Sequence, residues 1–404
     1  MSLRDYEGIA EPGDLRAIEK MAGALSGKKM LHVNSTAAGG GVAELLVRMV
    51  PLFKDIGLDV RWEVMQADRA FFEVTKNIHN SLQGRGSPIT REMWETYGAV
   101  NGANAARIDL DADFVVIHDP QPAMLIDFKT RGTWLWRCHI DISTPERVTW
   151  HFLKGIVEKY DGSVFSVANF AQSLPIQQFL MQPTIDPLAE KNAHLEDEEV
   201  RVIYERLGVP MDKPILLQVS RFDPFKDPLG VIEAYRLAKK YHDCRLVLAG
   251  GTATDDPEGE KVLAEVQERA AGDPDIHILL LPPFSDRDVN ALQRGATIVL
   301  QKSTREGFGL VVAEALWKKK PVIGGDVGGI PLQIIEGVTG YLVHSPEGAA
   351  YRIRQLLEDP ERVRRMGEAG REHIRRNFLI TRNLRNYLGI WTALEKKNEK
   401  VIYI

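Results

Sequence analysis

Cysteine is almost absent from this chain, in which Cys138 and Cys244 are the only two. They lie too far apart in sequence to suggest a disulfide framework. Each is next to an apolar run, so we expect two reduced, buried thiols. The sequence also lacks His–Cys clusters with metal-ligand spacing, short internal repeats and low-complexity segments, and the acidic run 255–258 is typical of a polar turn. We therefore expect no metal site.

The chain also has little excess of either charge sign, and it lacks long apolar runs. The formal net charge is −5, with 44% hydrophobic and 26% charged residues, as in ordinary globular proteins. This balance gives no reason to expect nucleic acid or a membrane surface as a partner. No apolar run approaches the length that spans a bilayer, and residues 1–6 do not resemble a signal peptide. A cytoplasmic protein is expected.

Short β-rich runs alternate with helical patterns along the whole chain, which favours parallel sheets covered by helices. The length of 404 residues is enough for two domains, each with its own core. The expected strands are 29–33, 60–65, 114–118, 164–167, 215–219, 245–249, 276–281, 297–301 and 322–324. Helices are expected at 195–206, 227–241 and 285–295, and an amphipathic helix at about 376–397.

A linker is predicted at 182–187, where two prolines interrupt the pattern. The expected domains are 1–186, joined by a C-terminal helix at about 381–404, and 187–380. The fold class is α/β, with two Rossmann-like, doubly wound domains facing across a cleft. Ligands should bind at the carboxyl ends of both sheets.

The segment 306–314 carries two carboxylates, Glu306 and Glu314, around a glycine turn that leads into a helix. A loop that enters a helix presents free amide groups and the positive end of the helix dipole, which suits a phosphate. Gly309 removes a side chain that would keep a ligand from the backbone. Glu314 is expected about two turns along the helix. The alternative is an ordinary helix start with solvated glutamates.

Two further loops follow expected strands. Arg221 and Lys226 come after strand 215–219, where a guanidinium fork and an ammonium can converge on one phosphate group. The glycine run 39–41 comes after strand 29–33 and opens a helix, but it matches neither the G-x-G-x-x-G fingerprint nor a P-loop. We expect Gly40 and Gly41 to contact a ligand, although a solvated loop and a simple turn remain the alternatives.

A third group of polar residues follows strand 114–118. His139 lies close to Asp119, Trp136 and Asp141 along the sequence, and His and Asp side chains at strand ends often line a cleft. A lone histidine is more often structural than catalytic. The presence of two such clusters in one domain favours a functional His139.

Together these motifs resemble the retaining glycosyltransferases of the GT-B fold. Arg221 with Lys226, followed by the E-x7-E pattern of Glu306 and Glu314, carries that resemblance over essentially the whole chain. The N-terminal segments resemble one group in particular, the trehalose glycosyltransferring synthases. These segments are 32–36, 39–44, 118–122, 134–141 and 185–188.

The resemblance implies that glucose is transferred from a nucleoside-diphosphate-glucose, such as UDP-glucose or ADP-glucose, to free glucose. No separate cofactor is implied. Arg221 and Lys226 should hold the diphosphate, with Glu306 on the glucose and Glu314 on the ribose. Phosphate should also meet the backbone at Phe308, Gly309, Leu310, Gly40 and Gly41. His139 should line the reaction centre, and Asp119, Trp136 and Asp141 should contact the acceptor.

The sequence is also compatible with other classes of protein. A trehalose phosphorylase, which uses glucose 1-phosphate, shares the N-terminal segments but is usually much longer. A nucleotide-sugar epimerase shares the E-x7-E fold, and a non-catalytic sugar-binding protein shares the expected cleft. An NAD-dependent oxidoreductase fits the glycine run poorly. The sequence settles neither the donor base nor the oligomeric state, a homodimer included.

Overall fold

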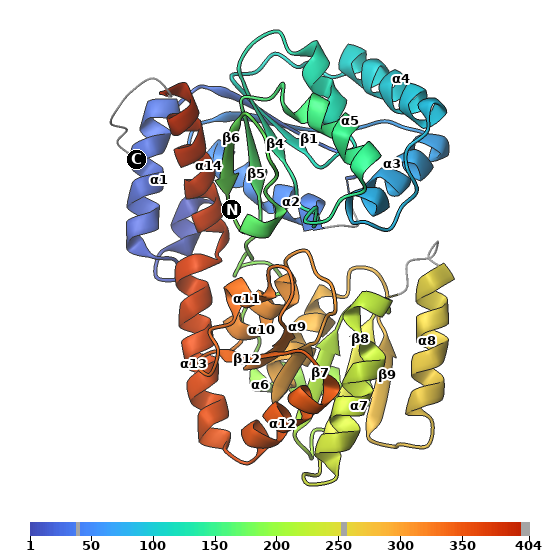
Figure 1. Cartoon of the computed structure of the whole chain (residues 1–404). Helices are drawn as coiled ribbons and strands as arrows, with labels where there is room; N and C mark the ends of the chain where they lie inside the picture. Colours follow the sequence, from blue (N-terminus) through green and yellow to red (C-terminus); the bar gives the residue numbers. More distant parts are fainter. Residues whose placement is uncertain (38–40, 252–256, 397–404) are drawn as a thin grey trace. The chain divides into compact units, whose positions relative to one another are not determined.

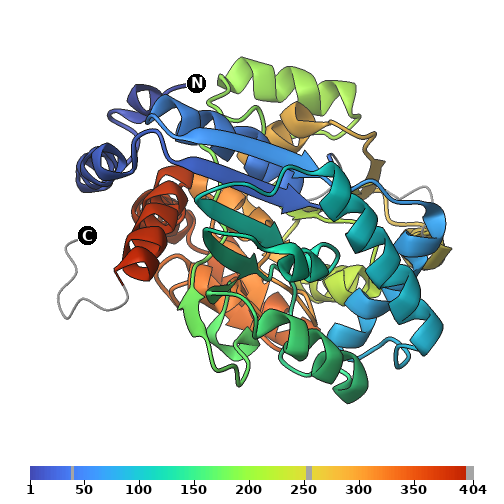
Figure 2. The same cartoon turned by 90° about the horizontal axis from the view of Figure 1, so that it is seen from above.

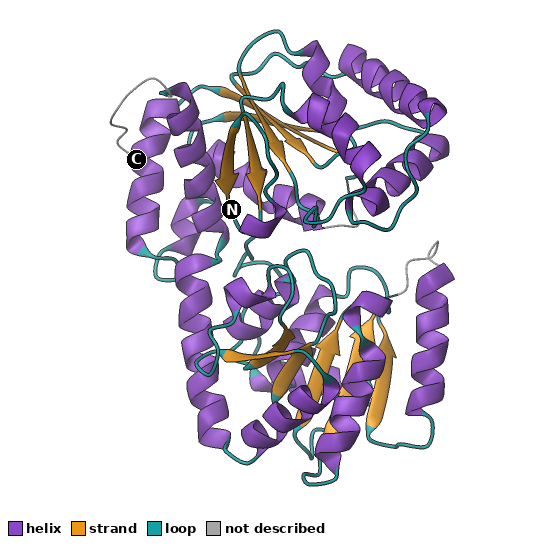
Figure 3. Cartoon of the chain, in the orientation of Figure 1, coloured by secondary structure: helices purple, strands orange, loops and turns teal. Residues whose placement is uncertain are grey.

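The computed structural model of this chain describes residues 1–37, 41–251 and 257–396. The chain forms two compact units. Unit 1 consists of Met1–Pro183 and the segment that begins at Ile380, and unit 2 consists of Thr184–Leu379. Each unit is a parallel sheet with helices packed on its faces (Figure 3).

The sheet of unit 1 has six strands in the order β2-β1-β3-β4-β5-β6, and all its strand pairs are parallel. Its strands are β1 (Lys29–Asn34), β2 (Asp59–Val64), β3 (Phe114–His118), β4 (Thr133–Arg137), β5 (Gly162–Phe165) and β6 (Gln177–Leu180). Its helices are α1 (Pro12–Leu25), α2 (Gly41–Asp55), α3 (Arg69–Leu82), α4 (Arg91–Arg107), α5 (Arg147–Val157) and α14 (Ile380–Glu395), with the short 3-10 helices η1 (Leu3–Tyr6), η2 (Ala123–Phe128) and η3 (Ala168–Phe170).

The sheet of unit 2 also has six parallel strands, in the order β12-β11-β10-β7-β8-β9. Its strands are β7 (Ile215–Val219), β8 (Arg245–Gly250), β9 (Ile276–Leu280), β10 (Ile298–Gln301), β11 (Val322–Gly325) and β12 (Gly340–Val343). Its helices are α6 (Asp197–Arg206), α7 (Pro228–Lys239), α8 (Pro257–Ala270), α9 (Asp286–Gly295), α10 (Leu310–Trp317), α11 (Ile330–Gln333), α12 (Pro346–Leu357) and α13 (Pro360–Asn377), with the 3-10 helix η4 (Pro224–Lys226).

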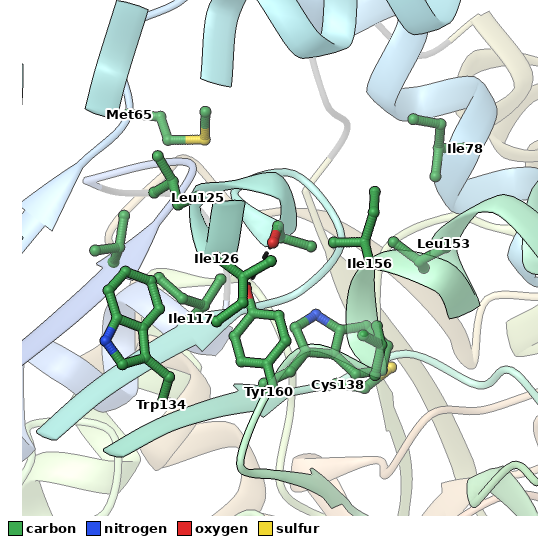
Figure 4. Close-up of a cluster of buried hydrophobic side chains, with 14 of the residues drawn as sticks. Met65, Ile78, Ile117, Leu125, Ile126, Trp134, Cys138, Leu153, Ile156 and Tyr160 are labelled. Atoms are coloured by element: carbon green, nitrogen blue, oxygen red, sulfur yellow. Dashed lines mark hydrogen bonds between the residues drawn. The ribbon is translucent and has the colours of Figure 1, made fainter. Parts of the chain in front are cut away.

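Unit 1 buries apolar side chains on both faces of its sheet, as parallel strands require. On one face, side chains from strands and helices form the cluster drawn in Figure 4, which includes Trp134, Cys138 and Ile156. On the other face, Trp391 of α14 stacks on Phe114 with ring centroids 4.8 Å apart. Helix α14 lies beside α1 (Figures 1 and 2), where Arg385 Nη1 donates to Asp14 Oδ1 at 2.6 Å.

Helices α7 and α12 of unit 2 begin at residues that satisfy free backbone amides. The Asp227 carboxylate accepts from Gly230 N at the start of α7, and Ser345 Oγ accepts from Gly348 N at the start of α12. Both helices have proline at the first turn, where a missing N–H costs nothing. The cap at Asp227 places α7 directly after η4, which carries Lys226.

Strand order reverses once in each sheet. In unit 1, β1 and β3 are neighbours, and the strand that follows β1 lies on one side of this pair while the strand that follows β3 lies on the other. In unit 2, β7 and β10 are related in the same way. In doubly wound sheets, ligands bind beyond the carboxyl ends of the strands at such a point. The loops that follow these four strands are therefore where binding residues are expected.

The predicted α/β class and the parallel arrangement of the sheets are confirmed. Strands β4, β6 and β12 were not predicted. Strand β6 has no buried residue and lies at the sheet edge, so it lacks an apolar pattern. The predicted helix at 376–397 was wrong at its start. Helix α13 ends at Asn377, and α14 begins at Ile380 after a break at Leu379, which bridges to Ile185.

Both cysteines are buried and unpaired, as predicted. Within the described ranges, no helix combines the length and the apolar character needed to cross a membrane.

Gly340 is predicted to be essential to the sheet of unit 2. A Cβ at this position would lie 2.1 Å from the backbone oxygen of Val322 on the neighbouring strand. Gly340→Ala should therefore lower the free energy of unfolding by about 2 kcal/mol or more, since strands β11 and β12 must separate. The control, Gly348→Ala in α12, meets only ordinary contacts and should be neutral or stabilising by about 0.5–1 kcal/mol. Urea unfolding of both variants measures the difference, and equal stabilities would contradict this assignment.

Candidate active site

In unit 2, polar side chains gather where β7 and β10 end. Lys226 Nζ donates to Glu306 Oε2 at 2.5 Å, and Gln301 Nε2 and Ser303 Oγ each donate to the same oxygen at 3.2 Å. We call these four residues the carboxylate cluster. Because β7 and β10 are adjacent, the loops that follow them bring together Lys226 and Glu306, which are 80 positions apart.

The carboxylate cluster is partly shielded from water, with side-chain exposures of 19% for Lys226 and 10% for Glu306. Shielding strengthens the ion pair, because the attraction between opposite charges grows as the local dielectric falls. The described hydrogen bonds of the Glu306 carboxylate all reach Oε2, and none of them reaches Oε1. Oε1 is thus available to a hydroxyl group of a ligand.

Two further contacts tie the same loops together. Thr304 N donates to Phe225 O at 2.8 Å, and the buried Lys302 ammonium pairs with the Asp227 carboxylate. Asp227 adopts a left-handed backbone with φ of 49°, directly after Lys226. These contacts fix the position of the Lys226 backbone relative to Glu306.

The turn between the two glutamates is hydrogen-bonded to Gln333 of α11. Its Nε2 donates to Phe308 O at 2.6 Å and lies 3.3 Å from Gly309 O. In a trans peptide the N–H and C=O groups point in opposite directions, so the Gly309 amide faces away from Gln333. Gly309 also has φ of 79°, a conformation that glycine adopts at little cost. The turn is therefore shaped to offer an amide to a ligand.

Glu314 is buried, with 6% of its surface exposed, and belongs to a different network. Gln293 Nε2 donates to Glu314 Oε2 at 3.1 Å, while Gln293 Oε1 accepts from Lys318 Nζ at 2.7 Å. Burial lowers the pKa of Lys318 to about 7. Helix α10 begins at Leu310, so Glu314 lies about one turn along it, not two as the sequence suggested.

Arg221 lies two residues beyond the end of β7 and makes only a long contact with the described residues. Its side chain is 64% exposed, and Nη2 lies 3.6 Å from Asp223 Oδ2. The structure therefore brings Lys226 and Glu306 together and leaves Arg221 extended at the same edge of the sheet.

In unit 1, three histidines form a hydrogen-bonded row across neighbouring strands. His32 Nδ1 lies 3.0 Å from His118 Nε2, and His118 Nδ1 lies 3.0 Å from His139 Nε2. We call them the histidine chain. Adjacent rings are nearly parallel, with centroids 5.3 Å apart in both pairs. The histidine chain spans β1, β3 and the end of β4, across the reversal of strand order.

The histidine chain runs from the core to the edge of the sheet. His32 and His118 are 0% and 1% exposed, while His139 is only partly buried. Burial lowers the pKa of His32 to about 3, and it also places the pKa values of His118 and His139 well below the usual range. All three rings are therefore neutral at physiological pH.

Asp119 supports the backbone at His139. Its Oδ1 accepts from His139 N at 2.7 Å, and its own carbonyl oxygen accepts from Trp136 Nε1 at 3.0 Å. Asp119 has φ of 64°, which is uncommon for a residue with a side chain. Burial raises the pKa of its carboxyl group to about 7.

The other predicted residues of unit 1 are placed differently. Trp136 is fully buried in the apolar core, where its indole supports Asp119 and has no accessible surface for a sugar. Asp141 is 7% exposed, and its Oδ1 accepts from Ser143 N and Oγ at 2.9 and 2.6 Å. Gly41 is the first residue of α2, and Gly40 lies outside the described residues.

Two family models match this chain. Residues 32–172 match "Trehalose synthase, N-terminal domain", and residues 200–373 match "Glycosyl transferases group 1". These matches fall on the two sheet-bearing units in order. Together with the two parallel six-stranded sheets, they define a glycosyltransferase of the GT-B fold.

Relatives of similar length show which group of glycosyltransferases the chain belongs to. The trehalose synthase of Pyrococcus horikoshii is 46% identical over 97% of this chain and 96% of the relative, and that of Rubrobacter xylanophilus is 43% identical over 97% of each. The chain belongs to the trehalose synthase family. A trehalose phosphorylase from Pleurotus pulmonarius is 29% identical over 92% of this chain but only 58% of the relative.

Solved structures share the fold at low identity. A sucrose-phosphate synthase from Thermosynechococcus elongatus has a TM-score of 0.70 at 18% identity, covering 92% of this chain and 100% of that one. A trehalose-phosphate synthase from Burkholderia xenovorans has a TM-score of 0.70 at 14% identity, covering 90% and 100%. The expected class of enzyme, a trehalose-forming glycosyltransferase, is thus confirmed.

Several residues of these networks were not assigned by sequence reasoning. Gln301, Ser303 and Gln333 position Glu306 and its turn, and His32 and His118 support His139. A usable signal did exist for the histidines, because both lie at or near the ends of strands that flank the reversal. Glutamine and serine carry no comparable signal.

Asp119 should make stability depend on pH in a defined direction. Its pKa is 3.8 in the unfolded chain and about 7 in the folded protein, so the folded protein holds a proton that the unfolded chain releases. The stability of the native protein relative to Asp119→Asn should therefore be greatest near pH 4 and fall as the pH rises towards about 7. Urea unfolding of both proteins across this range measures the difference.

Asp111→Asn is the matched control for this measurement. Its carboxylate pairs with Arg131, which holds the pKa below 3.8, so its titration lies under this pH window. The difference between the native protein and Asp111→Asn should stay flat. A flat result for Asp119→Asn as well would refute the raised pKa.

Proposed function

We propose that this enzyme makes trehalose by transferring glucose from a nucleoside-diphosphate-glucose to free glucose. The observation that carries the proposal is the ion pair of Lys226 and Glu306, which lies at the reversal of strand order in unit 2. A carboxylate beside an anionic diphosphate would be repelled unless a cation compensates its charge. Lys226 does so, which allows Glu306 to hold sugar hydroxyls next to phosphate.

Lys226 and Arg221 together hold the donor diphosphate in this proposal. The Lys226 ammonium has three N–H donors, of which Glu306 uses one, so two remain for phosphate oxygens. Arg221 is exposed and adds a planar fork of donors when the donor binds. The Gly309 amide that faces away from Gln333, with Phe308 and Leu310 beside it, completes the phosphate contacts.

Glu314 binds the ribose of the nucleotide. Gln293 holds Oε2 of its carboxylate, and no described hydrogen bond reaches Oε1, which we assign to a ribose hydroxyl. Unit 2 is thus the nucleotide-sugar unit, and unit 1 supplies the acceptor side. There His139 faces the reacting sugar, Asp119 fixes its backbone and Asp141 contacts the acceptor. The backbone at Gly40 and Gly41 is assigned to the donor phosphates.

Transfer proceeds with retention of the anomeric configuration. The transition state resembles an oxocarbenium ion, and Lys226 and Arg221 stabilise the charge that develops on the departing diphosphate. The donor phosphate accepts the proton of the attacking hydroxyl on the same face. The enzyme needs no divalent metal for this step, since the two cations supply the positive charge, and it acts in the cytoplasm without a nucleic-acid or membrane partner.

The donor is a nucleotide sugar in this proposal. One solved neighbour, from Escherichia coli, is described as bound with UDP-2-fluoro glucose, at a TM-score of 0.72 and 14% identity. Diphosphate and ribose are shared by UDP-, ADP- and GDP-glucose, and the proposed contacts involve only these shared parts. The similarity to trehalose phosphorylase makes glucose 1-phosphate the donor to exclude.

The donor is identified by incubating the enzyme with free glucose and each candidate in turn. A non-reducing disaccharide and free nucleoside diphosphate are expected with at least one nucleotide-glucose, also in the presence of EDTA. Loss of activity in EDTA that a divalent ion restores would contradict the metal-free step. Product with glucose 1-phosphate alone, with release of phosphate, would show a phosphorylase.

Lys226→Ala should lower kcat by about 10²–10³-fold, as expected for the loss of one preorganised charge-stabilising group. Glu306→Gln should also lose most activity while its urea unfolding midpoint stays close to that of the native protein. Lys261→Ala is the control, because Lys261 is an exposed residue of α8 in the same unit. Near-native turnover of Lys226→Ala would remove this residue from the site.

A further inference from the structure

The histidine chain ends at a methionine in the core. His32 Nε2, the ring nitrogen that does not face His118, lies 3.2 Å from Met30 Sδ. Met30 and His32 are two positions apart in β1, so their side chains lie on the same face of the sheet. Met30 and His32 are both 0% exposed, so bulk solvent does not reach this contact.

A thioether sulfur accepts hydrogen bonds but has no hydrogen to donate. The nitrogen that faces it must therefore carry the proton, which places the hydrogen of His32 on Nε2. A bare nitrogen would instead direct its lone pair at the lone pairs of sulfur. Since His32 is neutral, its Nδ1 is bare and can only accept.

The tautomer of His32 determines the tautomers of His118 and His139. His118 Nε2 must donate to the bare Nδ1 of His32, so the Nδ1 of neutral His118 is bare in turn. His139 Nε2 must then donate to His118, which leaves His139 with a bare Nδ1. Each ring holds one proton, and each hydrogen bond points towards the core.

From His32 to His139, each histidine lies nearer to the carboxyl ends of the strands than the one before it. His32 pairs with Val116 in the strand register, His118 lies two residues beyond Val116, and His139 lies two residues beyond Arg137, the partner of His118. A step of two residues preserves the face, so all three rings lie on one side of the sheet. The last ring, that of His139, is the one that is only partly buried.

We propose that Met30, His32 and His118 are positioning residues that fix the tautomer of His139, so that its Nδ1 meets the substrate as a hydrogen-bond acceptor. This inference rests on the proposed function only in naming a sugar hydroxyl as the donor to that nitrogen. Such a site selects a hydroxyl hydrogen at this position. It also sets the ring orientation of His139, because Nε2 is held by His118.

The tautomer is measured directly on the free enzyme by two-bond ¹H–¹⁵N correlation NMR at neutral pH. The signals of His139 are assigned by comparison with His139→Gln among the 10 histidines of the chain. A protonated Nε2 and a bare Nδ1 are expected. A proton on Nδ1, on both nitrogens, or divided evenly between the two would overturn the proposal.

Met30→Leu tests the role of the sulfur. It keeps an apolar side chain of similar size but removes the acceptor, so the row of hydrogen bonds can run in either direction. The His139 signals should then show both tautomers, and kcat should fall about two-fold if half of the molecules hold the wrong one. Met65→Leu, in the apolar cluster on the opposite face, is the control and should change neither.

An unchanged Nε2 tautomer in a folded Met30→Leu would show that the methionine does not set the direction. The NMR measurement needs no sugar, so it stands apart from the proposed reaction. Absence of trehalose synthesis together with the expected tautomer would refute the proposed function and leave the histidine chain intact.

Discussion

The reversal of strand order in each parallel sheet is the constraint on which both candidate sites depend. Neighbouring strands whose connections leave in opposite directions open a gap at their carboxyl ends, and only loop residues can reach into it. In unit 2 the segments after β7 and β10 bring Lys226 Nζ within 2.5 Å of Glu306 Oε2. In unit 1 the adjacent strands β1 and β3 themselves align His32 with His118. Sequence distance is irrelevant to either contact.

The two sites solve the problem of buried polar groups in different ways. The carboxylate cluster keeps its charges and pairs them, which preserves a partly shielded anion. The histidine chain keeps every ring neutral and satisfies all ring nitrogens except His139 Nδ1 internally, ending at the Met30 sulfur. One site is therefore built for electrostatic compensation and the other for directional hydrogen bonding.

The sequence predicted the parts of this molecule that have local signals. Buried strands such as β7 and the E-x7-E turn were evident because apolar runs and glycines stand out. The edge strand β6 and the break at Leu379 were missed, because they depend on pairing with distant residues. The resemblance to a family placed Lys226 and Glu306 in one site. Their ion pair, the hydrogen bonds from Gln333 and the row of histidines depend on the arrangement of the strands.

Helix α14 makes unit 1 depend on a segment that follows unit 2 in the sequence. The helix is separated from the rest of its unit by the whole of unit 2, yet its Trp391 and Tyr387 cover the sheet face where His32 lies. During synthesis, unit 2 is complete before this helix leaves the ribosome, and unit 1 is not. The nascent protein therefore carries an open apolar face while unit 2 is synthesised, and the histidine chain becomes enclosed only after α14 has followed unit 2.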